Sequence, residues 1–251
     1  MGQLDGKVAV ITGGGSGIGK GIARAFAAEG CAVALAGRNA ARLQATADEI
    51  ARDSGMGSEG VLAIPTDVTM EAQVVALFQQ VMARWGRVDI LVNSAAAFDW
   101  ARIDELSLAA WQRVIDTGVT GAFLCTREAF RIMKAQGGGR IVNIGSIAAQ
   151  RPRECSAAYT TSKHAIWGLT QSTALDGREF NIVASCLHPG NVAVERRIGA
   201  PAQSGKDEGN EVLMPTAEIA RVALLMVTLP PDVNMLEAIV LPVQQKYLGR
   251  G

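Results

Sequence analysis

Three residues near the middle of the chain have the types and spacing of a proton-transfer site. Ser146 precedes Tyr159 by thirteen residues, and Lys163 follows Tyr159 by four. Residues four apart on a helix share a face, so the Lys163 ammonium can lie beside the Tyr159 hydroxyl. A cation about 4 Å away, at an effective dielectric constant near 20, stabilises a phenolate by about 4 kcal/mol. Tyr159 is therefore a candidate acid or base, and the Ser146 hydroxyl can hold the substrate oxygen.

Each of these residues also has an ordinary structural interpretation. Tyr159 and Lys163 alone would be a surface pair on a helix, and Ser146 alone would be a turn residue. Their joint spacing, downstream of a nucleotide motif, is what favours catalysis. The two histidines, His164 and His188, have no spacing that makes a base–nucleophile pair.

A glycine-rich turn near the N-terminus predicts a nucleotide site. This turn, residues 12–19, follows a β-branched run and precedes a helical pattern. Glycines let the backbone approach a pyrophosphate, whose charge is stabilised at the N-terminus of the next helix. A tight turn without a ligand is the alternative. The expected cofactor contacts in the turn are Gly13, Gly15, Ser16, Gly17, Ile18 and Gly19.

The elements that must position these residues alternate between short apolar runs and longer helical patterns. Strands with little polar alternation are typical of a sheet covered on both faces, and parallel neighbours need crossover helices. We expect strands at 8–12, 32–37, 61–66, 90–93, 140–144, 182–188 and 238–241. We expect helices at 19–29, 40–53, 71–85, 108–134, 157–176 and 216–229. The pattern predicts an α/β fold: a doubly wound (Rossmann-type) parallel sheet of about seven strands with helices on both faces.

Domain organisation follows from what is missing between these elements. No Pro- or Gly-rich linker and no internal repeat divides the chain, so residues 1–251 are interpreted as a single nucleotide-binding and catalytic domain. The least regular segment, around 194–212, contains a polar stretch too long for an ordinary connection. It is either a substrate lid or an exposed insertion.

Composition argues against several other classes of protein. The 24 Lys+Arg balance 24 Asp+Glu, so no net field draws the chain to nucleic acid or to an anionic membrane. No apolar stretch approaches the roughly 20 residues of a membrane span, and no signal-peptide pattern opens the sequence, which predicts a cytoplasmic protein. The 4 Cys lack Cys-x-x-Cys spacing and only 2 His accompany them, so we expect neither a metal site nor disulfides.

Taken together, the motifs resemble those of the short-chain dehydrogenase/reductases, of the single-domain, NADP-preferring type. The glycine turn, Ser146 and Tyr159-x-x-x-Lys163 are accompanied by Asp67-Val68, Asn93-Ser94-Ala95-Ala96 and His188-Pro189-Gly190, so the resemblance spans essentially the whole chain. It implies an NADP(H)-dependent oxidoreductase that interconverts a carbonyl and an alcohol by hydride transfer. The implied catalytic residues are Ser146, Tyr159 as the acid/base, and Lys163, which also holds the nicotinamide ribose.

The resemblance implies further cofactor contacts where the strands end. The adenosine is expected to meet Asp67, Val68 and Asn93, with Asp67 accepting from the adenine amino group. The nicotinamide carboxamide is expected to meet Pro189, Gly190 and Val192. Asp67 has an alternative role as the N-cap of the following helix.

Cofactor preference can be read at the end of the second strand. An NAD site usually places Asp or Glu about 20 residues beyond the glycines, to accept from the ribose 2′-OH. This chain has Gly37 there, followed by Arg38 and Asn39. Without a carboxylate to repel it, a 2′-phosphate can pair with the Arg38 guanidinium, so NADP (NADPH) is the expected cofactor. The alternative is that Arg38 is an exposed loop cation, and Ser16, where many NADP-using relatives carry a second basic residue, adds no support.

Several positions depart from the family's pattern. Gly118 replaces the Asn of an Asn-x-x-Gly stretch, Val194 replaces a Thr that contacts the nicotinamide or phosphate, and Ser94 and Ala96 stand where Asn and Gly are common. These departures keep a second hypothesis open, a non-catalytic NADP-binding or sensing protein of the same fold. We expect an active enzyme, because Gly118 retains the backbone carbonyl that the Asn contributes to a proton relay.

The substrate and partners are less constrained. We expect a small-molecule carbonyl or alcohol substrate, and the resemblance implies a homotetramer or homodimer built on the long helices. Phe98 and Trp100 either wall the substrate pocket or make ordinary core or lid contacts. Arg151 and Arg153 are interpreted as solvated surface charges rather than as a site for an acidic substrate, because Glu154 adjoins them.

Overall fold

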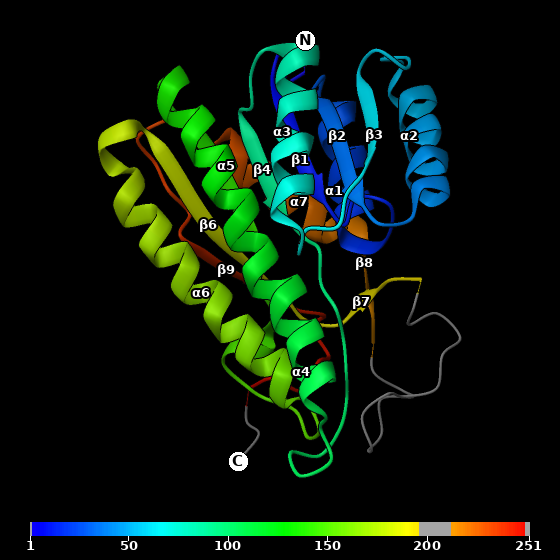
Figure 1. The fold of residues 1–251 in the computed structure, drawn as a ribbon, viewed down its shortest axis with the longest axis vertical. Coiled ribbons are helices and arrows are strands. Elements are labelled where there is room, and N and C mark those ends of the chain that lie inside the picture. The colour runs from blue at the N-terminus through cyan, green and yellow to red at the C-terminus, as the bar shows by residue number, and fades with distance from the viewer. Residues whose placement is uncertain (1, 196–211, 249–251) are drawn as a thin grey trace.

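The centre of the molecule is a seven-stranded sheet in which all neighbouring strands pair in parallel. The computed structural model describes residues 2–195 and 212–248 (Figure 1). The strand order is β3-β2-β1-β4-β5-β6-β9. The strands are β1 (Val8–Thr12), β2 (Ala32–Gly37), β3 (Val61–Pro65), β4 (Ile90–Asn93), β5 (Gly139–Ile144), β6 (Ile182–Pro189) and β9 (Glu237–Val240). The predicted doubly wound α/β sheet is confirmed.

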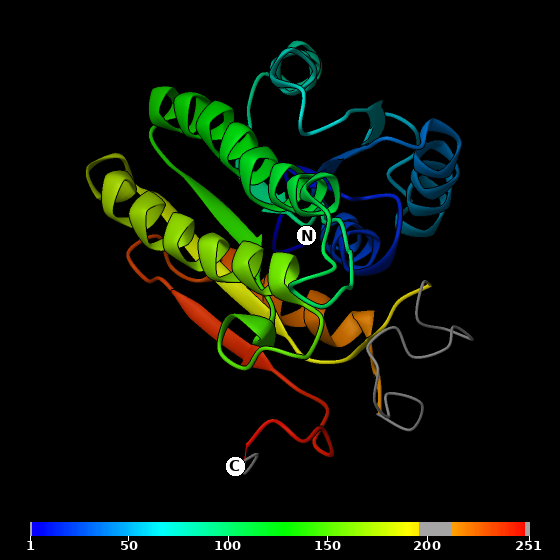
Figure 2. The same ribbon diagram turned by 60° about the horizontal axis from the view of Figure 1, so that its bottom comes forward.

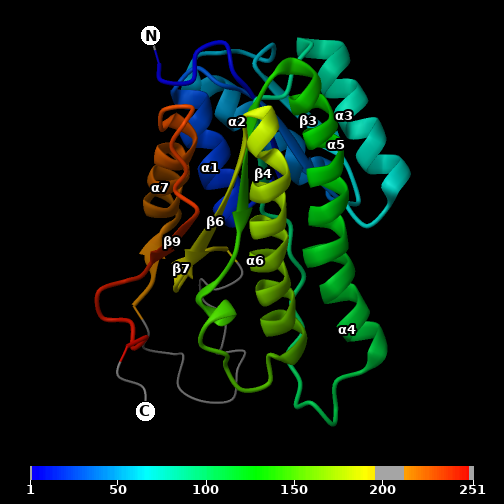
Figure 3. The ribbon, with the colours of Figure 1, turned by 90° about the vertical axis from the view of Figure 1, so that its left-hand side faces the viewer.

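Helices cover both faces of this sheet, as the views in Figures 2 and 3 show. One face carries α1 (Gly17–Ala28), α2 (Ala40–Ser54) and α7 (Thr216–Thr228). The other carries α3 (Glu71–Trp85), α5 (Gly121–Gln136) and α6 (Ala157–Gly177), with α4 (Leu108–Ile115) leading into α5. On this second face α5 and α6 run side by side (Figure 2).

The two-sided core follows from the alternation of side chains along each strand. In β1, Ala9 and Ile11 enter the cluster under α1, α2 and α7, whereas Val8 and Val10 enter the cluster under α3 and α5. All four are buried, and full burial of a Val or Ile side chain contributes about 1.5–3 kcal/mol. An uninterrupted apolar strand therefore needs helices on both sides.

The sheet order creates a switch point between β1 and β4, where ligands of doubly wound folds bind. Thr12, at the end of β1, ties the two strand ends together. Its hydroxyl accepts from the N–H groups of Ser94 (3.0 Å) and Ala95 (3.1 Å). The loops that follow β1 and β4 are thereby held against each other at the carboxyl edge of the sheet.

Two features of the described chain differ from the sequence expectation. The helix expected over 108–134 is divided by a π-helical turn, Asp116–Thr120, which inserts an extra residue between α4 and α5 and buries Gly118. Two short strands, β7 (Val192–Ala193) and β8 (Met214–Pro215), pair in parallel outside the main sheet. The expected lid around 194–212 falls almost entirely on 196–211, outside the described residues.

Within residues 2–195 and 212–248, no helix combines the length and the apolar character of a membrane span. In the same ranges, no three His, Cys, Asp or Glu side chains gather as a metal site would require.

Candidate active site

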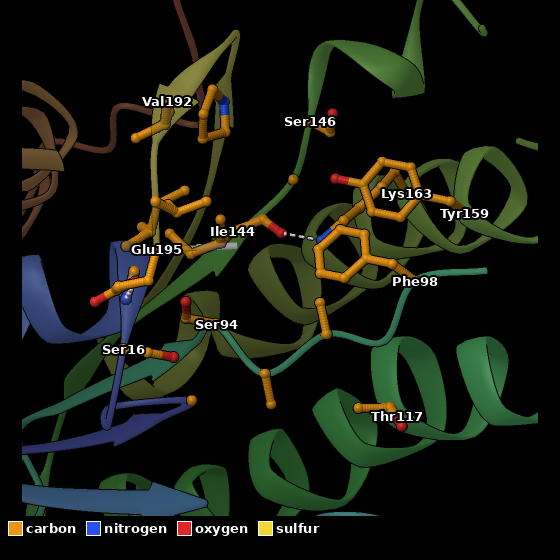
Figure 4. A pocket seen from close by; sticks show the side chains of 18 of the residues that line it. Ser16, Ser94, Phe98, Thr117, Ile144, Ser146, Tyr159, Lys163, Val192 and Glu195 are labelled. Atoms are coloured by element: carbon orange, nitrogen blue, oxygen red, sulfur yellow. Dashed lines mark hydrogen bonds between the residues drawn. The ribbon is translucent and has the colours of Figure 1, made fainter. Parts of the chain in front are cut away.

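A cleft of about 800 Å³ runs along the carboxyl edge of the sheet and brings the separate motifs together (Figure 4). The candidate catalytic residues Ser146, Tyr159 and Lys163 line one part of it, and the glycine turn lines another. The remaining expected contacts that line it are Gly13, Gly15, Ser16, Gly17, Ile18, Arg38, Asn39, Asp67, Val68, Pro189, Gly190 and Val192. Two expected contacts, Gly19 and Asn93, do not line the cleft.

Ser146 is positioned by the end of β5. It is the N-cap of the 3₁₀ turn Ile147–Ala149, and its hydroxyl oxygen accepts from the N–H of Ala148 at 3.1 Å. That contact orients the oxygen and leaves the hydroxyl proton for another acceptor. Figure 4 shows the Tyr159 hydroxyl directed toward Ser146. The two hydroxyl groups can therefore face one substrate oxygen.

Tyr159 and Lys163 lie on the first turns of α6. The Lys163 Nζ is 5.5 Å from the centroid of the Tyr159 ring, and it donates to the Ile144 carbonyl oxygen at 2.8 Å. Lys163 is only 5% exposed, and a buried ammonium needs such a partner. The end of β5 thus holds the cation beside the Tyr159 ring, as a spacing of four residues on one helix face requires.

An aromatic wall stands against the Tyr159 ring. The ring centroids of Phe98 and Trp100 are 5.1 Å and 5.8 Å from that of Tyr159. The Ala101 N–H donates to the Cys155 carbonyl at 3.0 Å and so fastens the loop after β4 to the start of α6. Both aromatic residues line the cleft, which favours their interpretation as a substrate wall.

The His188 ring contacts the backbone of Ser146, a contact that sequence analysis missed. Its Nδ1 lies 2.9 Å from the Ser146 carbonyl oxygen and 3.2 Å from the Ser146 nitrogen. The side chain is fully buried, and burial lowers the pKa of the ring, so the neutral form is favoured. The contact could have been inferred from the pairing of the two strands. Ile144 pairs with Leu187, so the residues that follow them, which include Ser146 and His188, lie close together.

The glycine turn is shaped by close backbone approach. A Cβ on Gly19 would lie 2.5 Å from the Gly13 carbonyl oxygen, so only glycine lets α1 start this close to β1. Gly19 therefore supports the turn from beneath rather than lining the cleft. Gly17 has φ +55, a left-handed conformation that glycine adopts without strain.

An anion already occupies the N-terminus of α1. The Glu195 carboxylate accepts from the Gly17 N–H at 2.8 Å, on the side of the cleft opposite Tyr159 (Figure 4). Helix N-termini stabilise negative charge, and here the carboxylate stands in for a phosphate oxygen. The turn therefore fits the pyrophosphate expected there. Sequence analysis missed Glu195 because it lies 178 residues from Gly17 in the chain.

Two arginines line the far end of the cleft. Arg38 is exposed, and its guanidinium makes no hydrogen bond or ion pair within the described part of the chain. Arg42, in the first turn of α2, is a second exposed cation that sequence analysis missed. Asn39 caps this helix, its Oδ1 accepting from the Arg42 N–H at 2.9 Å. Arg42 could have been predicted as a cofactor contact from the sequence, because a helix cap at Asn39 places Arg42 in the first turn of the helix, close to Arg38.

Asp67 closes a local turn rather than capping α3. Its Oδ1 accepts from the Thr69 N–H (3.0 Å) and the Thr69 hydroxyl (2.8 Å). The N-cap of α3 is Met70, which has no side-chain cap. The alternative role of Asp67 as the helix N-cap is therefore wrong, and its carboxylate lines the cleft.

Asn93 lies beneath the cleft instead of in its wall. Its Nδ2 donates to Asn143 Oδ1 (2.8 Å) and Thr126 Oγ1 (3.0 Å), and the residue is 6% exposed. A buried amide needs such partners. The side chain thus joins β4, β5 and α5 under the site, and the expected contact of Asn93 with the adenosine stays a prediction.

The sheet is doubly wound, and the cleft at its switch point contains a glycine-rich turn and a buried Lys beside a Tyr. These features define a Rossmann-type nucleotide-binding protein. The family model described as short chain dehydrogenase matches residues 7–204, and the chain belongs to this family of oxidoreductases, the short-chain dehydrogenase/reductases. A short chain dehydrogenase/reductase of Aspergillus oryzae is 37% identical over 211 residues, covering 83% of this chain and 80% of that protein.

Solved structures share the whole architecture. An alcohol dehydrogenase from the archaeon Thermococcus sibiricus, complexed with 5-hydroxy-NADP, superimposes with a TM-score of 0.84 at 28% identity, over 96% of this chain and 98% of its own. A 3-ketoacyl-(acyl-carrier-protein) reductase from Brucella melitensis, complexed with NADH, superimposes with a TM-score of 0.83 at 26% identity, over 95% of this chain and 98% of its own. Because these two neighbours carry different nicotinamide cofactors, the fold does not decide the preference.

Proposed function

We propose that this protein is an NADP(H)-dependent oxidoreductase that interconverts a carbonyl and an alcohol, with Tyr159 as the acid/base. The observation that carries the proposal is the position of the buried Lys163 ammonium, 5.5 Å from the Tyr159 ring centroid, in a cleft shared with Ser146. A surface pair would have no reason to bury the cation.

The roles of the chain's own residues follow from this geometry. When bound, a nicotinamide cofactor supplies or accepts the hydride. The Ser146 hydroxyl holds the substrate oxygen, and the Tyr159 hydroxyl donates its proton to that oxygen in reduction and removes it in oxidation. Lys163 stabilises the phenolate that results, while the Ile144 carbonyl keeps the ammonium in place.

Other residues of the cleft would hold the cofactor. The N-terminus of α1 would bind the pyrophosphate once the Glu195 carboxylate leaves the Gly17 N–H. Asp67 and Val68 would meet the adenine, Lys163 the nicotinamide ribose, and the segment from Pro189 through Gly190 to Val192 the carboxamide. These assignments rest on the family resemblance and on the presence of every one of these residues in the cleft wall.

NADPH should bind more tightly than NADH. Arg38 and Arg42, both exposed, line the cleft together with Gly37, which stands where an NAD site usually has a carboxylate. Charge-assisted bonds from a guanidinium to a 2′-phosphate correspond to about ten- to over a hundredfold in affinity. Arg38→Ala should remove about tenfold or more of this preference in a fluorescence titration. Arg52→Ala, in the last turn of α2, is the matched control. Equal dissociation constants for the two cofactors in the unaltered protein would remove the argument.

Gly118→Asn should change the rate by no more than about tenfold, a barrier shift of roughly 1.4 kcal/mol. A Cβ on Gly118 would lie 3.6 Å from Ser162, an ordinary contact, so a side chain can start at this position without displacing Ser162. The backbone carbonyl, the group we assign to the proton relay, is present in both residues. Steady-state kinetics tests this, and a variant that switches on activity in an otherwise inert protein would contradict it.

The rival hypothesis is a non-catalytic NADP-binding or sensing protein. Gly118 and Val194, which replace the family's Asn and Thr, are the observations that favour it. A screen of NADPH oxidation over ketones, aldehydes and keto acids separates the two hypotheses. The enzyme consumes NADPH steadily with at least one compound, whereas the sensor binds NADPH without turnover.

We also propose that the protein assembles as a homotetramer or homodimer through its long helices. Leu108, Phe123 and Leu175 are 69%, 45% and 57% exposed on α4, α5 and α6. Apolar groups at these positions can be buried between copies of the chain. Light scattering should therefore give a mass of two or four chains, and a monomer mass would overturn this proposal. The cytoplasmic location stays a prediction from the sequence.

A further inference from the structure

We propose that His188 is a positioning residue for the reaction, and that its neutral ring, with the proton on Nε2, fixes the backbone of Ser146. The inference rests on the proposed function, because it concerns how the Ser146 hydroxyl is held at the substrate oxygen. His188 does not line the cleft. Its ring contacts the nitrogen and the carbonyl oxygen of Ser146, so it acts on the reaction through that residue.

The end of β5 leaves room for this ring. A Cβ on Gly145 would lie 2.6 Å from His188 Nδ1 and 2.7 Å from its Cε1, closer than real Cβ atoms approach, so a larger residue there would displace the ring. Trp167 of α6 meets the ring edge to face, with the centroids 6.0 Å apart and the planes at 74°. The His188 side chain is fully buried, and these neighbours fix where it lies.

The hydrogen bonds of the Ser146 backbone select the tautomer of the ring. The Ser146 carbonyl oxygen already accepts from the Ala149 N–H at 2.9 Å, whereas the Ser146 N–H has His188 Nδ1 as its acceptor at 3.2 Å. A buried N–H needs an acceptor, so Nδ1 carries the lone pair and the neutral ring carries its proton on Nε2. The other tautomer would donate from Nδ1 to the carbonyl oxygen, 2.9 Å away, and deprive the N–H of this acceptor.

Glu237, the first residue of β9, lies beside the other ring nitrogen. Nε2 of His188 is buried and makes no well-aligned hydrogen bond within residues 2–195 and 212–248, and Glu237 Oε1 lies 3.3 Å from it. A carboxylate at this distance favours a proton on Nε2 over a lone pair. The same Oε1 accepts from Gln150 at 2.9 Å, and Gln150 ends the 3₁₀ turn that begins at Ser146. Glu237 thus favours the tautomer that the Ser146 backbone requires.

The surroundings of the ring also keep it neutral. Burial is the main cause of the lowered pKa of His188, and it outweighs the Ser146 backbone and the Glu237 carboxylate, which act in the opposite direction. The Lys163 ammonium lowers the pKa of the ring as well. A charged ring would have a donor at Nδ1, which could no longer accept from the Ser146 N–H. The neutral ring is therefore the form that fits this contact.

The last residues of β5 are held from two neighbouring elements. Lys163 of α6 donates to the Ile144 carbonyl at 2.8 Å, and His188 of β6 accepts from the Ser146 N–H. Between them, the Gly145 N–H donates to the Leu187 carbonyl at 2.7 Å. Misplacement of a reacting group by about 1 Å can cost about a hundredfold in rate, so the contact with His188 matters for kcat.

A double-mutant cycle tests whether His188 acts through Ser146. His188→Leu should lower kcat by about ten- to a hundredfold, as misplacement of a reacting group does. In a Ser146→Ala protein, which lacks the hydroxyl to be positioned, the same change should lower kcat by no more than about threefold. Equal losses in the two backgrounds, or a His188→Leu protein with normal kcat, would overturn the inference. Titration with NADPH verifies that each variant is folded.

His188→Asn supplies a rescue, because its amide oxygen can accept from the Ser146 N–H as Nδ1 does. Its kcat should exceed that of His188→Leu by at least about threefold, as one recovered hydrogen bond provides. An Asn variant no faster than the Leu variant counts against the inference. His164→Gln is the matched control. His164 is exposed, with its Nδ1 2.9 Å from the Thr160 carbonyl oxygen, and its replacement should leave kcat unchanged.

NMR of the ring nitrogens keeps the inference separate from the proposed function. The chain contains 2 His, so His164→Gln assigns the signals of a protein labelled at its histidines. At neutral pH, His188 should show a protonated Nε2 and an unprotonated Nδ1, and Glu237→Ala should weaken that preference. This result supports the inferred contact even if no carbonyl compound is reduced and the proposed function fails. A proton on Nδ1 in the unaltered protein overturns the inference and leaves the proposed function standing.

Discussion

Tyr159→Phe should lose at least about a hundredfold in kcat while binding NADPH as the unaltered protein does. The substitution keeps the ring between Phe98 and Lys163 and removes only the hydroxyl that faces Ser146. General acid–base catalysis is typically worth about 10²- to 10⁴-fold, so the loss should fall in that range. Steady-state kinetics and a fluorescence titration of NADPH measure the two parts separately.

The chain contains 2 Tyr, which supplies a matched control. Tyr247→Phe removes the other phenol hydroxyl and keeps the ring that lies beside Arg151. It should leave kcat within about threefold, since no proton transfer depends on it. If Tyr159→Phe retained more than about a tenth of the rate, Tyr159 would not be the general acid.

Lys163→Ala should impair both turnover and cofactor binding. Loss of a cation worth about 4 kcal/mol to the phenolate corresponds to roughly a thousandfold in rate. The same change removes the group that we assign to the nicotinamide ribose and frees the Ile144 carbonyl, so the dissociation constant for NADPH should rise too. The pattern differs from that of Tyr159→Phe, which affects turnover alone.

Lys134→Ala is the control for this charge. Lys134 lies in the last turn of α5, over the Phe180 ring, and does not line the cleft. It should leave the rate and the NADPH affinity unchanged. A Lys163→Ala protein with normal turnover would show that Tyr159 does not depend on the ammonium, and the proton-transfer account would fail.

Most of the fold could be predicted because it rests on local patterns. An uninterrupted apolar run such as 8–12 is recognisable as a two-faced buried strand, and the alternating helices then imply parallel neighbours. The π-helical turn at Asp116–Thr120 could not be predicted, because α4 and α5 keep one helical periodicity on either side of it. The burial of Gly118 opposite Ser162 is a tertiary contact, and only the structure reveals it.

In the candidate site, too, local spacing could be predicted from the sequence and contacts between distant segments could not. Tyr159 and Lys163 are four residues apart on one helix, so their proximity follows from spacing alone. The position of Glu195 at the α1 N-terminus depends on a contact between distant segments, which has no local signature. For Asn93, the motif locates the residue at the end of β4, and the structure adds that its side-chain amide donates to Asn143 in the core.

The most direct test of the central claim follows the hydride itself. NADPH carrying deuterium at the transferable position is incubated with the protein and a carbonyl compound that is reduced in the screen, and the product alcohol is examined by mass spectrometry. The account predicts that the alcohol gains one deuterium at the former carbonyl carbon, and that Tyr159→Phe, with NADPH still bound, forms the same labelled product at least about a hundredfold more slowly. Tight NADPH binding with no labelled alcohol from any ketone, aldehyde or keto acid would contradict it.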